Sequence, residues 1–362
     1  MTARTARSRE VWRIGVIGGT GRYARRRCLP ALAALPEVRL VALHGRDPGR
    51  LREVGAEHGV PKLYTDPEAL IADPDVDAVL ITAPNHLHHP LTLAAFERSK
   101  HVLCEKPLAV TLAEAIEMEE LRRRTGLVGM TGFRFRFMPA AIHLKALVDA
   151  GEIGRVQHAR LWCWQDWAAD GCEYLANPSM RWRLQRRLAG AGVLGDIGAH
   201  LFDIACWWFG DPIEIAGRTA QMGRTRAPLG GEPIGVDNDD WFAAWALFQD
   251  RENGVRVTFE ASRVAPGVGI EMGMAVSGTK GCIRVTASEP TTMYVAVGGG
   301  RYEARPAPGT EVDLAFIRGF VAMLNGEAEH PSFADGVRVQ AMIEAVEDSH
   351  RRSAPVQLTP LA

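Results

Sequence analysis

The chain has 362 residues, enough for about two domains at roughly 150 residues each. Hydrophobic residues make up 47% and charged residues 23%, which is typical of a globular protein and excludes a wholly disordered chain. The formal net charge of −1 gives no basic excess for nucleic-acid phosphates, and no apolar run reaches the roughly 18 to 20 residues of a membrane span. We therefore predict that the protein binds neither nucleic acid nor a membrane.

Two features of the sequence bear on its compartment. Residues 1–10 carry Arg4, Arg7 and Arg9 without a long apolar stretch behind them, so we expect a frayed arm and not a secretory signal. The six cysteines are spread along the chain without a Cys-x-x-Cys pair. This usage predicts reduced thiols and a cytoplasmic protein.

Apolar strand-like runs alternate with amphipathic stretches from residue 11 to residue 133. We expect strands at 11–17, 38–43, 78–82, 101–104 and 127–132, and helices at 47–58, 90–99 and 111–125. The last of these helices begins with a capping-box pattern, Thr111 with Glu114. Short, continuously apolar strands separated by helices predict an α/β domain with a parallel sheet covered on both faces.

The order of predicted strands and helices changes after about residue 150. We expect strands at 155–164, 214–221, 241–249, 255–262, 272–277, 281–285 and 291–297, followed by helices at 312–325 and 334–353. Successive strands with few helices between them indicate a large, mostly antiparallel sheet. Residues 134–362 are therefore predicted to form an α+β domain for substrate binding and oligomerisation, whose last helix is free to pack back on the first domain.

A glycine-rich loop follows the first predicted strand. Gly19-x-Gly21-x-x-Ala24 fits the dinucleotide fingerprint, in which missing side chains let the backbone approach a pyrophosphate. Gly18 leaves the register of the first glycine open, and a plain glycine-rich turn is the alternative. The context predicts a Rossmann domain over residues 11–133. The predicted cofactor contacts in this loop are Gly19, Thr20, Gly21, Arg22, Tyr23 and Ala24.

The end of the second predicted strand bears on the choice of cofactor. An NAD enzyme usually places an acidic residue there for the ribose hydroxyls, but this chain has His44-Gly45-Arg46. A guanidinium without a nearby carboxylate suits a 2′-phosphate, so Gly45 and Arg46 are predicted cofactor contacts and NADP(H) is favoured over NAD(H). The alternative is that Arg46 is solvated and that Asp47 reaches back to the ribose.

Three further motifs carry a resemblance to a known family. They are Ala83-Pro84-Asn85-His86-Leu87-His88, Cys104-Glu105-Lys106-Pro107-Leu108 and the segment from Gly190 to His200. Together with the glycine loop they resemble the Gfo/Idh/MocA oxidoreductases, which are NAD(P)-dependent sugar and polyol dehydrogenases and keto-sugar reductases. The segment 333–340 is similar to the closing helix of that family. The resemblance covers nearly the whole chain.

By matching position, the resemblance implies that Lys106, Asp196 and His200 are catalytic. The chemistry is reasonable, because moving a hydride from a secondary alcohol requires a group that exchanges the hydroxyl proton. A histidine suits that exchange, a carboxylate four residues earlier in a helix can orient it, and an ammonium can stabilise charge on the oxygen. The alternatives are a buried structural histidine and a solvated lysine at a strand end.

The resemblance also implies further contacts with cofactor and substrate. Around the nicotinamide ribose the predicted cofactor contacts are Ala83, Pro84, Asn85, His88, Glu105 and Lys106. The predicted substrate contacts are Lys106, Arg136, Trp164, Arg183, Asp196 and His200. Trp164 is included because an indole face is a good platform for the apolar side of a sugar ring, and core packing is the alternative. The histidines near residue 88 lack a second group with zinc-like spacing, so no metal is predicted.

The chain departs from the family pattern at two positions. Arg134 stands where relatives carry Asn, so it is either an extra cation toward an anionic substrate or a linker charge. Cys28 stands where relatives carry His, and we expect it to pack. Asp203 shares the helix face of Asp196, and its role is left open between supporting the site and filling the core.

These observations predict an oxidoreductase that transfers a hydride between NADP(H) and a secondary alcohol or ketone of a sugar or cyclic polyol. One alternative is a glycosidase of the same fold that uses a bound nicotinamide transiently. Another is a regulator that senses a dinucleotide without catalysis. An apolar open sheet face is costly in water, so we also expect a homodimer or homotetramer through the second domain's sheet.

Overall fold

The computed structural model describes residues 10–249 and 254–359. The chain divides into two compact units, residues up to Arg134 with Glu311–Val337, and Phe135–Thr310 with the residues from Arg338 onward. All but the last residue of the expected N-terminal arm lie outside the described residues.

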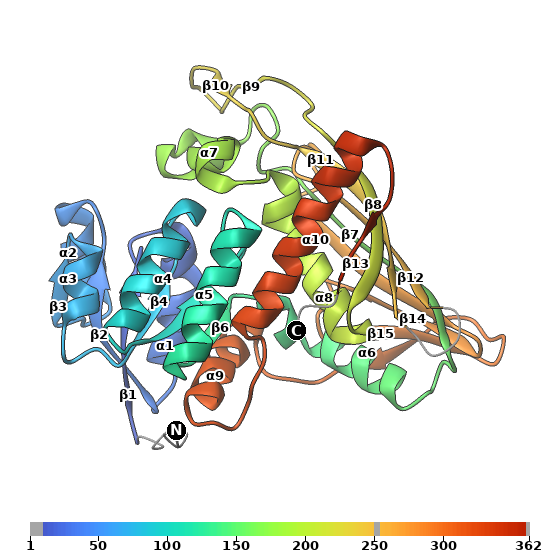
Figure 1. The fold of residues 1–362 in the computed structure, drawn as a ribbon, viewed down its shortest axis with the longest axis horizontal. Coiled ribbons are helices and arrows are strands. Elements are labelled where there is room, and N and C mark those ends of the chain that lie inside the picture. The colour runs from blue at the N-terminus through green and yellow to red at the C-terminus, as the bar shows by residue number, and fades with distance from the viewer. Residues whose placement is uncertain (1–9, 250–253, 360–362) are drawn as a thin grey trace. The chain divides into compact units, whose positions relative to one another are not determined.

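The first unit contains a six-stranded parallel sheet in the order β3-β2-β1-β4-β5-β6 (Figure 1). This is the strand order of a Rossmann fold, so the predicted fold class is confirmed for this unit. The strands are β1 (Trp12–Ile17), β2 (Val38–His44), β3 (Lys62–Tyr64), β4 (Ala78–Ile81), β5 (His101–Cys104) and β6 (Gly129–Thr131). The three-residue β3 escaped prediction because it is too short to show a periodicity.

Helices connect these strands as the sequence pattern predicts. The capping box of α5 forms as expected, since Thr111 caps the N–H of Glu114 and Gly126 ends the helix at φ +68°. The helices of this unit are α1 (Leu29–Ala33), α2 (Pro48–Glu57), α3 (Pro67–Ala72), α4 (His88–Glu97), α5 (Leu112–Thr125) and α9 (Val312–Leu324).

The return of the segment Glu311–Val337 to the first unit was not part of the predicted division at residue 133. Two side-chain contacts bind it: Trp12 Nε1 donates to Asn325 Oδ1 over 2.9 Å, and Arg27 pairs with Asp313 over 2.9 Å. The following helix α10 (Phe333–Arg352) therefore begins in the first unit and continues in the second.

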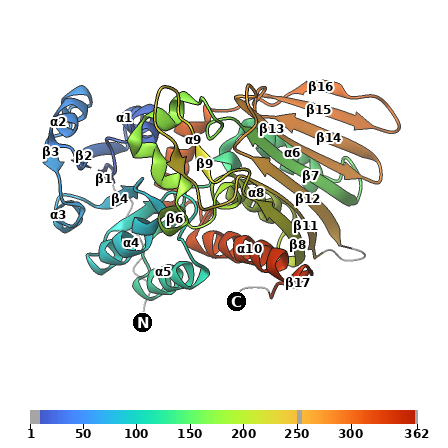
Figure 2. The ribbon, with the colours of Figure 1, turned by 90° about the horizontal axis from the view of Figure 1, so that it is seen from above.

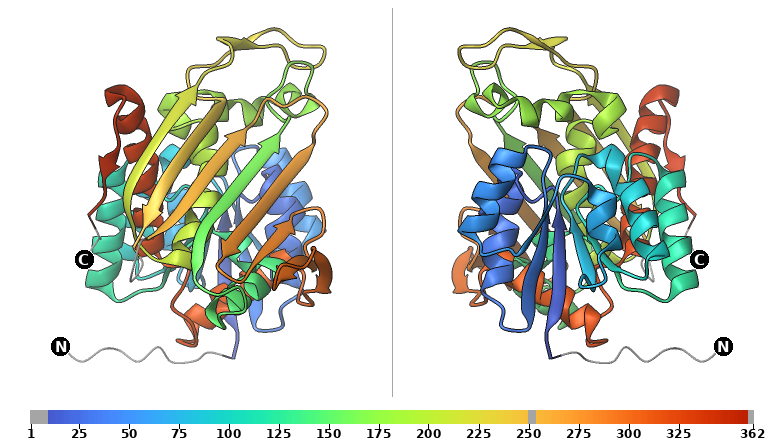
Figure 3. Two further views of the ribbon diagram at one scale, coloured as in Figure 1. Left: turned by 90° about the vertical axis from the view of Figure 1, so that its right-hand side faces the viewer. Right: turned by 90° about the vertical axis from the view of Figure 1, so that its left-hand side faces the viewer.

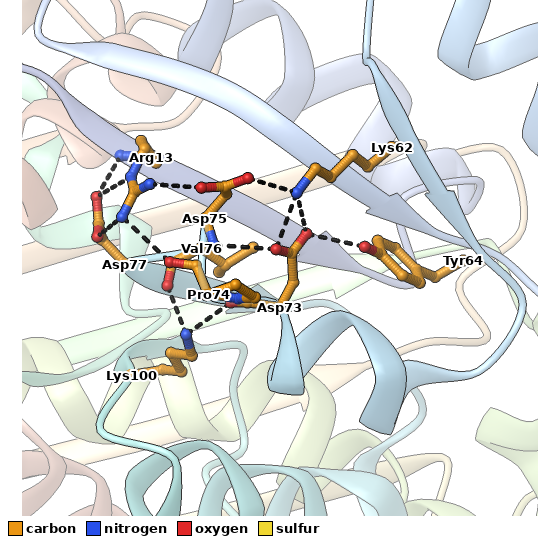
Figure 4. Close-up of polar contacts among 9 residues, drawn as sticks. All are labelled: Arg13, Lys62, Tyr64, Asp73, Pro74, Asp75, Val76, Asp77 and Lys100. Carbon is orange, nitrogen blue, oxygen red and sulfur yellow. Dashed lines mark hydrogen bonds and ion pairs between the residues drawn. The ribbon is translucent and has the colours of Figure 1, made fainter.

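Charged side chains fasten the amino-terminal edge of the parallel sheet (Figure 4). Arg13, next to the start of β1, binds Asp77 over 2.8 Å, and Lys62 at the start of β3 binds Asp73 over 2.9 Å. The ammonium of Lys100 donates to the backbone oxygens of Asp73 and Val76 over 2.8 and 2.7 Å. These contacts occupy the edge opposite to the carboxyl ends of the strands, where α/β sheets bind ligands.

The second unit contains a nine-stranded sheet in the order β16-β15-β14-β13-β7-β12-β11-β8-β17 (Figure 2). All neighbouring strands are antiparallel except β7 and β12, so the predicted mostly antiparallel sheet is confirmed. Its strands are β7 (Val156–Gln165), β8 (Pro212–Ala220), β11 (Trp241–Phe248), β12 (Val255–Ser262), β13 (Ile270–Gly278), β14 (Gly281–Thr286), β15 (Thr292–Val297), β16 (Glu303–Pro306) and β17 (Val356–Gln357).

Helices of this unit cover one face of the large sheet. Phe202 of α8 packs on Phe242 and Phe259 of the strands, with ring centroids 5.8 and 4.9 Å apart. On the other face, no helix of the described residues lies over the strands (Figure 3, left). The remaining elements of the unit are α6 (Pro139–Asp149), α7 (Arg186–Ala189), α8 (Ala199–Phe209) and the short strands β9 (Thr225–Arg226) and β10 (Ile234–Gly235).

One helical stretch of the described residues, Arg186–Phe209, is long and apolar enough by length and composition to cross a membrane. Of its most apolar window, 83% is buried within the structure. Buried core helices of water-soluble proteins meet the same criteria, so this stretch gives only weak support for a membrane span.

Candidate active site

The glycine loop after β1 lies against the ends of two neighbouring strands. A Cβ atom on Gly18 would lie 2.9 Å from the backbone oxygen of Thr82, and one on Gly19 would lie 2.1 Å from Leu43 Cδ1. Gly18 also has a φ of +79°, which other residues rarely adopt. Both glycines are therefore favoured by the close packing of this loop, and a glycine-rich turn between β1 and the following helix is the context in which Rossmann domains bind a pyrophosphate.

His44, the last residue of β2, fixes this loop. Its Nδ1 atom accepts the N–H of Gly18 over 3.2 Å, and its backbone oxygen accepts the N–H of Gly19 over 3.0 Å. Burial lowers the pKa of His44, partly opposed by a hydrogen bond to the backbone of Thr65. A neutral imidazole with an acceptor nitrogen is the form that this contact needs.

Arg46 is exposed just beyond β2, and Gly45 packs so closely on Thr20 that a Cβ atom would lie 2.4 Å from its methyl group. Asp47 caps α2, because its Oδ1 atom accepts the N–H of Arg50 over 2.7 Å. Asp47 was the alternative partner for the ribose hydroxyls, and its carboxylate instead caps α2 in this structure.

Glu105 and Lys106 follow β5. The Glu105 carboxyl is 8% exposed, and its Oε1 atom has no hydrogen-bond partner among the described residues. Burial raises the pKa of Glu105, against the charge of Lys106 and a hydrogen bond with the Tyr23 hydroxyl. A buried acceptor without a partner fits a site completed by a ligand that donates hydrogen bonds, as a nicotinamide ribose does.

His88, a predicted cofactor contact, is 1% exposed, and its ring is held by the backbone of two loops. Its Nδ1 and Nε2 atoms lie 2.9 Å from the backbone oxygens of Pro107 and Ala83. Burial lowers the pKa of His88 to about 4, so the ring is neutral near pH 7 and donates to one of the two oxygens. The residue braces the loops after β4 and β5 against each other. Asn85 is buried in the 3-10 turn Asn85–Leu87 that directly precedes α4.

In the second unit, Asp196 and His200 lie where a π-helical turn (Leu194–Gly198) leads into α8. Such turns within helices are rare and occur frequently at functional sites. His200 is 8% exposed, and its ring lies against Phe135 with centroids 4.3 Å apart. Phe135 was not among the predicted site residues, although it stands in the alternating aromatic and arginine segment Phe133-Arg134-Phe135-Arg136-Phe137.

Comparison with known proteins agrees with these features. Residues 12–133 match the oxidoreductase family model with an NAD-binding Rossmann fold, and residues 142–284 match the GFO/IDH/MocA C-terminal domain. The levoglucosan dehydrogenase of Pseudarthrobacter phenanthrenivorans is 30% identical over 370 residues, which cover 91% of each chain. The chain belongs to the Gfo/Idh/MocA oxidoreductase family.

Other members of the Gfo/Idh/MocA family match over similar lengths. The scyllo-inositol 2-dehydrogenase (NAD(+)) of Bacillus subtilis is 27% identical over 345 residues, 94% of each chain. A solved structure of levoglucosan dehydrogenase with NADH and L-sorbose gives a TM-score of 0.87 at 28% identity, covering 96% of this chain and 99% of that one. The predicted family and the assignment as an enzyme are therefore confirmed.

Arg136 of this Gfo/Idh/MocA chain is a predicted substrate contact that the structure places elsewhere. Its guanidinium is 6% exposed and holds Asp203 of α8, with Nε at 2.9 Å and Nη2 at 2.5 Å from the carboxylate oxygens. Asp203, whose role was open, is its partner. The buried ion pair joins Arg136 to α8.

Trp164 is a further predicted substrate contact, and the strand register shows which face of the large sheet it occupies. Across the β7–β12 pair, Leu161 lies opposite Phe259, which packs on α8. Trp164, three positions after Leu161, projects from the other face of the pleated sheet. The apolar alternation of Leu161 and Cys163 in the sequence already carried this signal.

Three further residues that the sequence singled out, Arg183, Arg134 and Cys28, each lie in a different environment. Arg183 is partly exposed, with its guanidinium 4.3 Å from the centre of the Trp182 ring. Arg134 binds Asp313 within the first unit over 2.9 Å, which favours the linker alternative. Cys28 is buried, as expected for a packing residue.

Proposed function

We propose that this protein transfers a hydride between NADP(H) and a secondary alcohol or ketone of a sugar or cyclic polyol. The observation that carries the proposal is the full-length likeness to a sugar dehydrogenase together with the presence of Lys106, Asp196 and His200 in their expected motifs. The substrate class of the relatives supports a sugar-like substrate, and the retained acid–base groups argue against a non-catalytic sensor.

Each of the three residues has a distinct task in the proposal. The nicotinamide, when bound, supplies or accepts the hydride. The imidazole of His200 takes the hydroxyl proton during oxidation and returns it during reduction. The Asp196 carboxylate orients His200, and the Lys106 ammonium hydrogen-bonds the reacting oxygen and stabilises the charge that develops there.

We infer a preference for NADP(H) from the carboxyl end of β2. Exposed Arg46 is available for a 2′-phosphate, whereas Asp47 is engaged in capping α2. The glycine cradle and the unpartnered Glu105 oxygen fit either dinucleotide, so the preference rests on Arg46. The structures of the related levoglucosan dehydrogenase hold NADH, which makes this preference the part of the proposal most in need of measurement.

We further propose that the open face of the large sheet joins copies of this chain into a dimer or tetramer. A shallow groove of about 730 Å³ on β7, β8, β11 and β12 has Trp241 and Trp245 in its walls, together with the charges of Arg160 and Glu260. Trp245 is 40% exposed. An apolar face bearing both charge signs suits pairing with a second copy of itself. None of the six cysteines, all within the described residues, forms a disulfide, which supports a cytoplasmic enzyme.

The test is a screen of anhydrosugars, inositols, aldoses and keto-sugars with both dinucleotides, following the absorbance of the reduced nicotinamide. We expect turnover of at least one sugar or cyclic polyol, and its loss in Lys106→Met and His200→Asn. Full activity in both variants would contradict the assigned residues. Cleavage of a chromogenic glycoside without net change in reduced nicotinamide would favour the glycosidase.

A further inference from the structure

Four consecutive polar residues, Asp237 to Asp240, stand directly before β11, and their side chains bind different segments of the second unit. Asp237 Oδ1 accepts the N–H of Arg186 over 2.5 Å, at the start of α7. Asn238 donates to the backbone oxygen of Arg183 over 3.0 Å, and Asp240 accepts from Arg263 over 2.9 Å. The residues directly before β11 therefore bind several other segments of the second unit.

Asp239 makes the contacts that bear on the chemistry. Its Oδ1 atom accepts the N–H of Gly192 over 2.6 Å, and its Oδ2 atom accepts the N–H of Leu194 over 2.7 Å. Its backbone oxygen accepts the N–H of Val193 over 2.9 Å. Three successive amides are thus bound by one residue that is 45 or more positions away in the sequence.

The junction leaves almost no room for a different arrangement. A Cβ atom on Gly192 would lie only 2.0 Å from the backbone oxygen of Asp239. Asp239 itself is 7% exposed, so its carboxylate is shielded from water and its two amide partners replace the lost hydration. Displacement of the carboxylate would leave these amide donors without their acceptor.

The three amides lead directly into the turn that carries the proposed catalytic pair. Leu194 is the first residue of the π-helical turn that contains Asp196, and His200 follows in the first turn of α8. At the start of the π-helical turn, the residue at the N-cap makes no side-chain hydrogen bond to the turn. The first N–H groups of a helix need acceptors, and a carboxylate at this end is also favoured by the helix dipole. Asp239 supplies that cap from the neighbouring sheet.

We propose that Asp239 is a positioning residue for the reaction, which fixes the turn bearing Asp196 and His200 through its two carboxylate hydrogen bonds. The inference rests on the proposed function, because it takes those two residues as the acid–base pair. Asp239 touches neither substrate nor cofactor in this role. Misplacement of a catalytic group by about 1 Å costs on the order of 100-fold in rate, so a precise anchor has a measurable effect.

The test compares Asp239→Asn and Asp239→Glu with the control Asp237→Asn. The control makes the same change of chemistry in the same loop, at a carboxylate that accepts a single N–H at the start of α7 through one oxygen, which Asn retains. Asn keeps one acceptor oxygen but turns an NH2 group toward an amide donor, and Glu keeps the charge but adds a methylene. We expect both Asp239 variants to lower kcat by about 10- to 100-fold, with the substrate KM and the dinucleotide Kd changed less than threefold. The control should retain kcat within about twofold.

Two further readouts separate positioning from general stability. The pH profile of kcat/KM should shift in the Asp239 variants and not in Asp237→Asn, because the environment of His200 changes only in the former. Amide hydrogen exchange of the peptide spanning residues 192–200 should become faster in the Asp239 variants. If Asp239→Asn does not fold, Asp239→Glu provides the same comparison.

The outcomes distinguish the two proposals. An unaltered kcat and pH profile in a folded Asp239 variant, when His200→Asn is inactive, would overturn the positioning role alone. A fully active His200→Asn would instead overturn the proposed function. A kcat loss equal to that of Asp237→Asn would show a structural role for Asp239 and would also overturn the proposal.

Discussion

The imidazole of His44 accepts a hydrogen bond from the backbone N–H of Gly18 over 3.2 Å, and this contact ties the phosphate loop to the end of β2. The two residues lie 26 positions apart in the sequence. The loop is therefore held in shape by a side chain from the strand that Gly45 and Arg46 follow.

Replacing His44 by Leu is expected to weaken dinucleotide binding. The Gly18 amide would lose its acceptor, at a cost of about 1 to 2 kcal/mol, which corresponds to roughly 5- to 30-fold in Kd. Titration of the reduced dinucleotide by fluorescence measures the change. His44→Asn, which retains an acceptor, should lose less, and His58→Leu at the far end of α2 should bind as wild type. Equal binding by all three variants would show that the loop does not need this contact.

Arg46 is expected to set the choice between the two dinucleotides. The wild-type enzyme should have a higher kcat/KM with NADPH than with NADH, and Arg46→Asp should reverse the ratio by at least about tenfold through loss of a charge-assisted pair. Steady-state kinetics with both cofactors measures the ratio. Arg50→Asp, one turn later on α2, is the control and should change it less. A wild-type preference for NADH would refute the role of Arg46.

His88 is expected to make stability depend on pH between about 6.5 and 4. Its folded-state pKa is about 4, below the ordinary value of 6.5, because burial disfavours the charged ring. The unfolded chain therefore takes up the proton first as the pH falls, so the stabilisation is complete above pH 6.5 and declines as the pH falls toward 4. The difference amounts to about 3 kcal/mol at 1.36 kcal/mol per pH unit.

Urea unfolding across this range tests the effect. His88→Asn should be less stable than wild type at pH 7 but should show a shallower decline toward pH 4. His89→Asn is the control, because His89 is a partly exposed partner of Glu117 and should keep the wild-type slope. Parallel declines in wild type and His88→Asn would exclude His88 as the source.

The sequence predicted those parts of the fold that depend on local patterns. The buried run Ala78–Ile81, the capping box of Thr111 and the glycine loop each carry their signal within a few residues. The proposed acid–base pair, Asp196 and His200, likewise lies only four residues apart in the sequence. Such features are visible because their physical cause, periodicity or spacing, is written in consecutive positions.

The sequence did not reveal which partners several polar side chains have in the folded chain. His88 and Arg136 are predicted ligand contacts. In the structure, the ring of His88 lies between the backbone oxygens of Ala83 and Pro107. The guanidinium of Arg136 binds the carboxylate of Asp203. Residue type indicates which bonds a side chain makes, whereas burial and partner depend on tertiary packing. Asp239 was missed for the same reason, because its amide partners are some 45 residues away.

Trp245 is expected to stabilise the assembly of subunits. Trp245→Glu would place a charge on the open face of the large sheet, where burial against a second copy would require its desolvation. Light scattering should then show a shift from dimer or tetramer to monomer. Ile142→Glu on α6 introduces the same charge at another exposed apolar position and should leave the assembly intact. A wild-type monomer would contradict the proposed interface.

The Arg136–Asp203 pair is expected to couple stability to activity. Asp203→Leu would leave the guanidinium buried without its partner, at a cost of about 3 to 5 kcal/mol in the free energy of unfolding. Arg136 is adjacent in sequence to Phe135, whose ring packs against His200, so kcat should fall as well. The double variant Arg136→Met with Asp203→Leu removes both charges and should recover much of the stability. If Asp203→Leu costs no more than Asp149→Asn, which breaks the surface pair with Lys145, the buried pair contributes little. Recovery of stability without recovery of kcat would show that the guanidinium positions Phe135 and His200 in addition to holding α8.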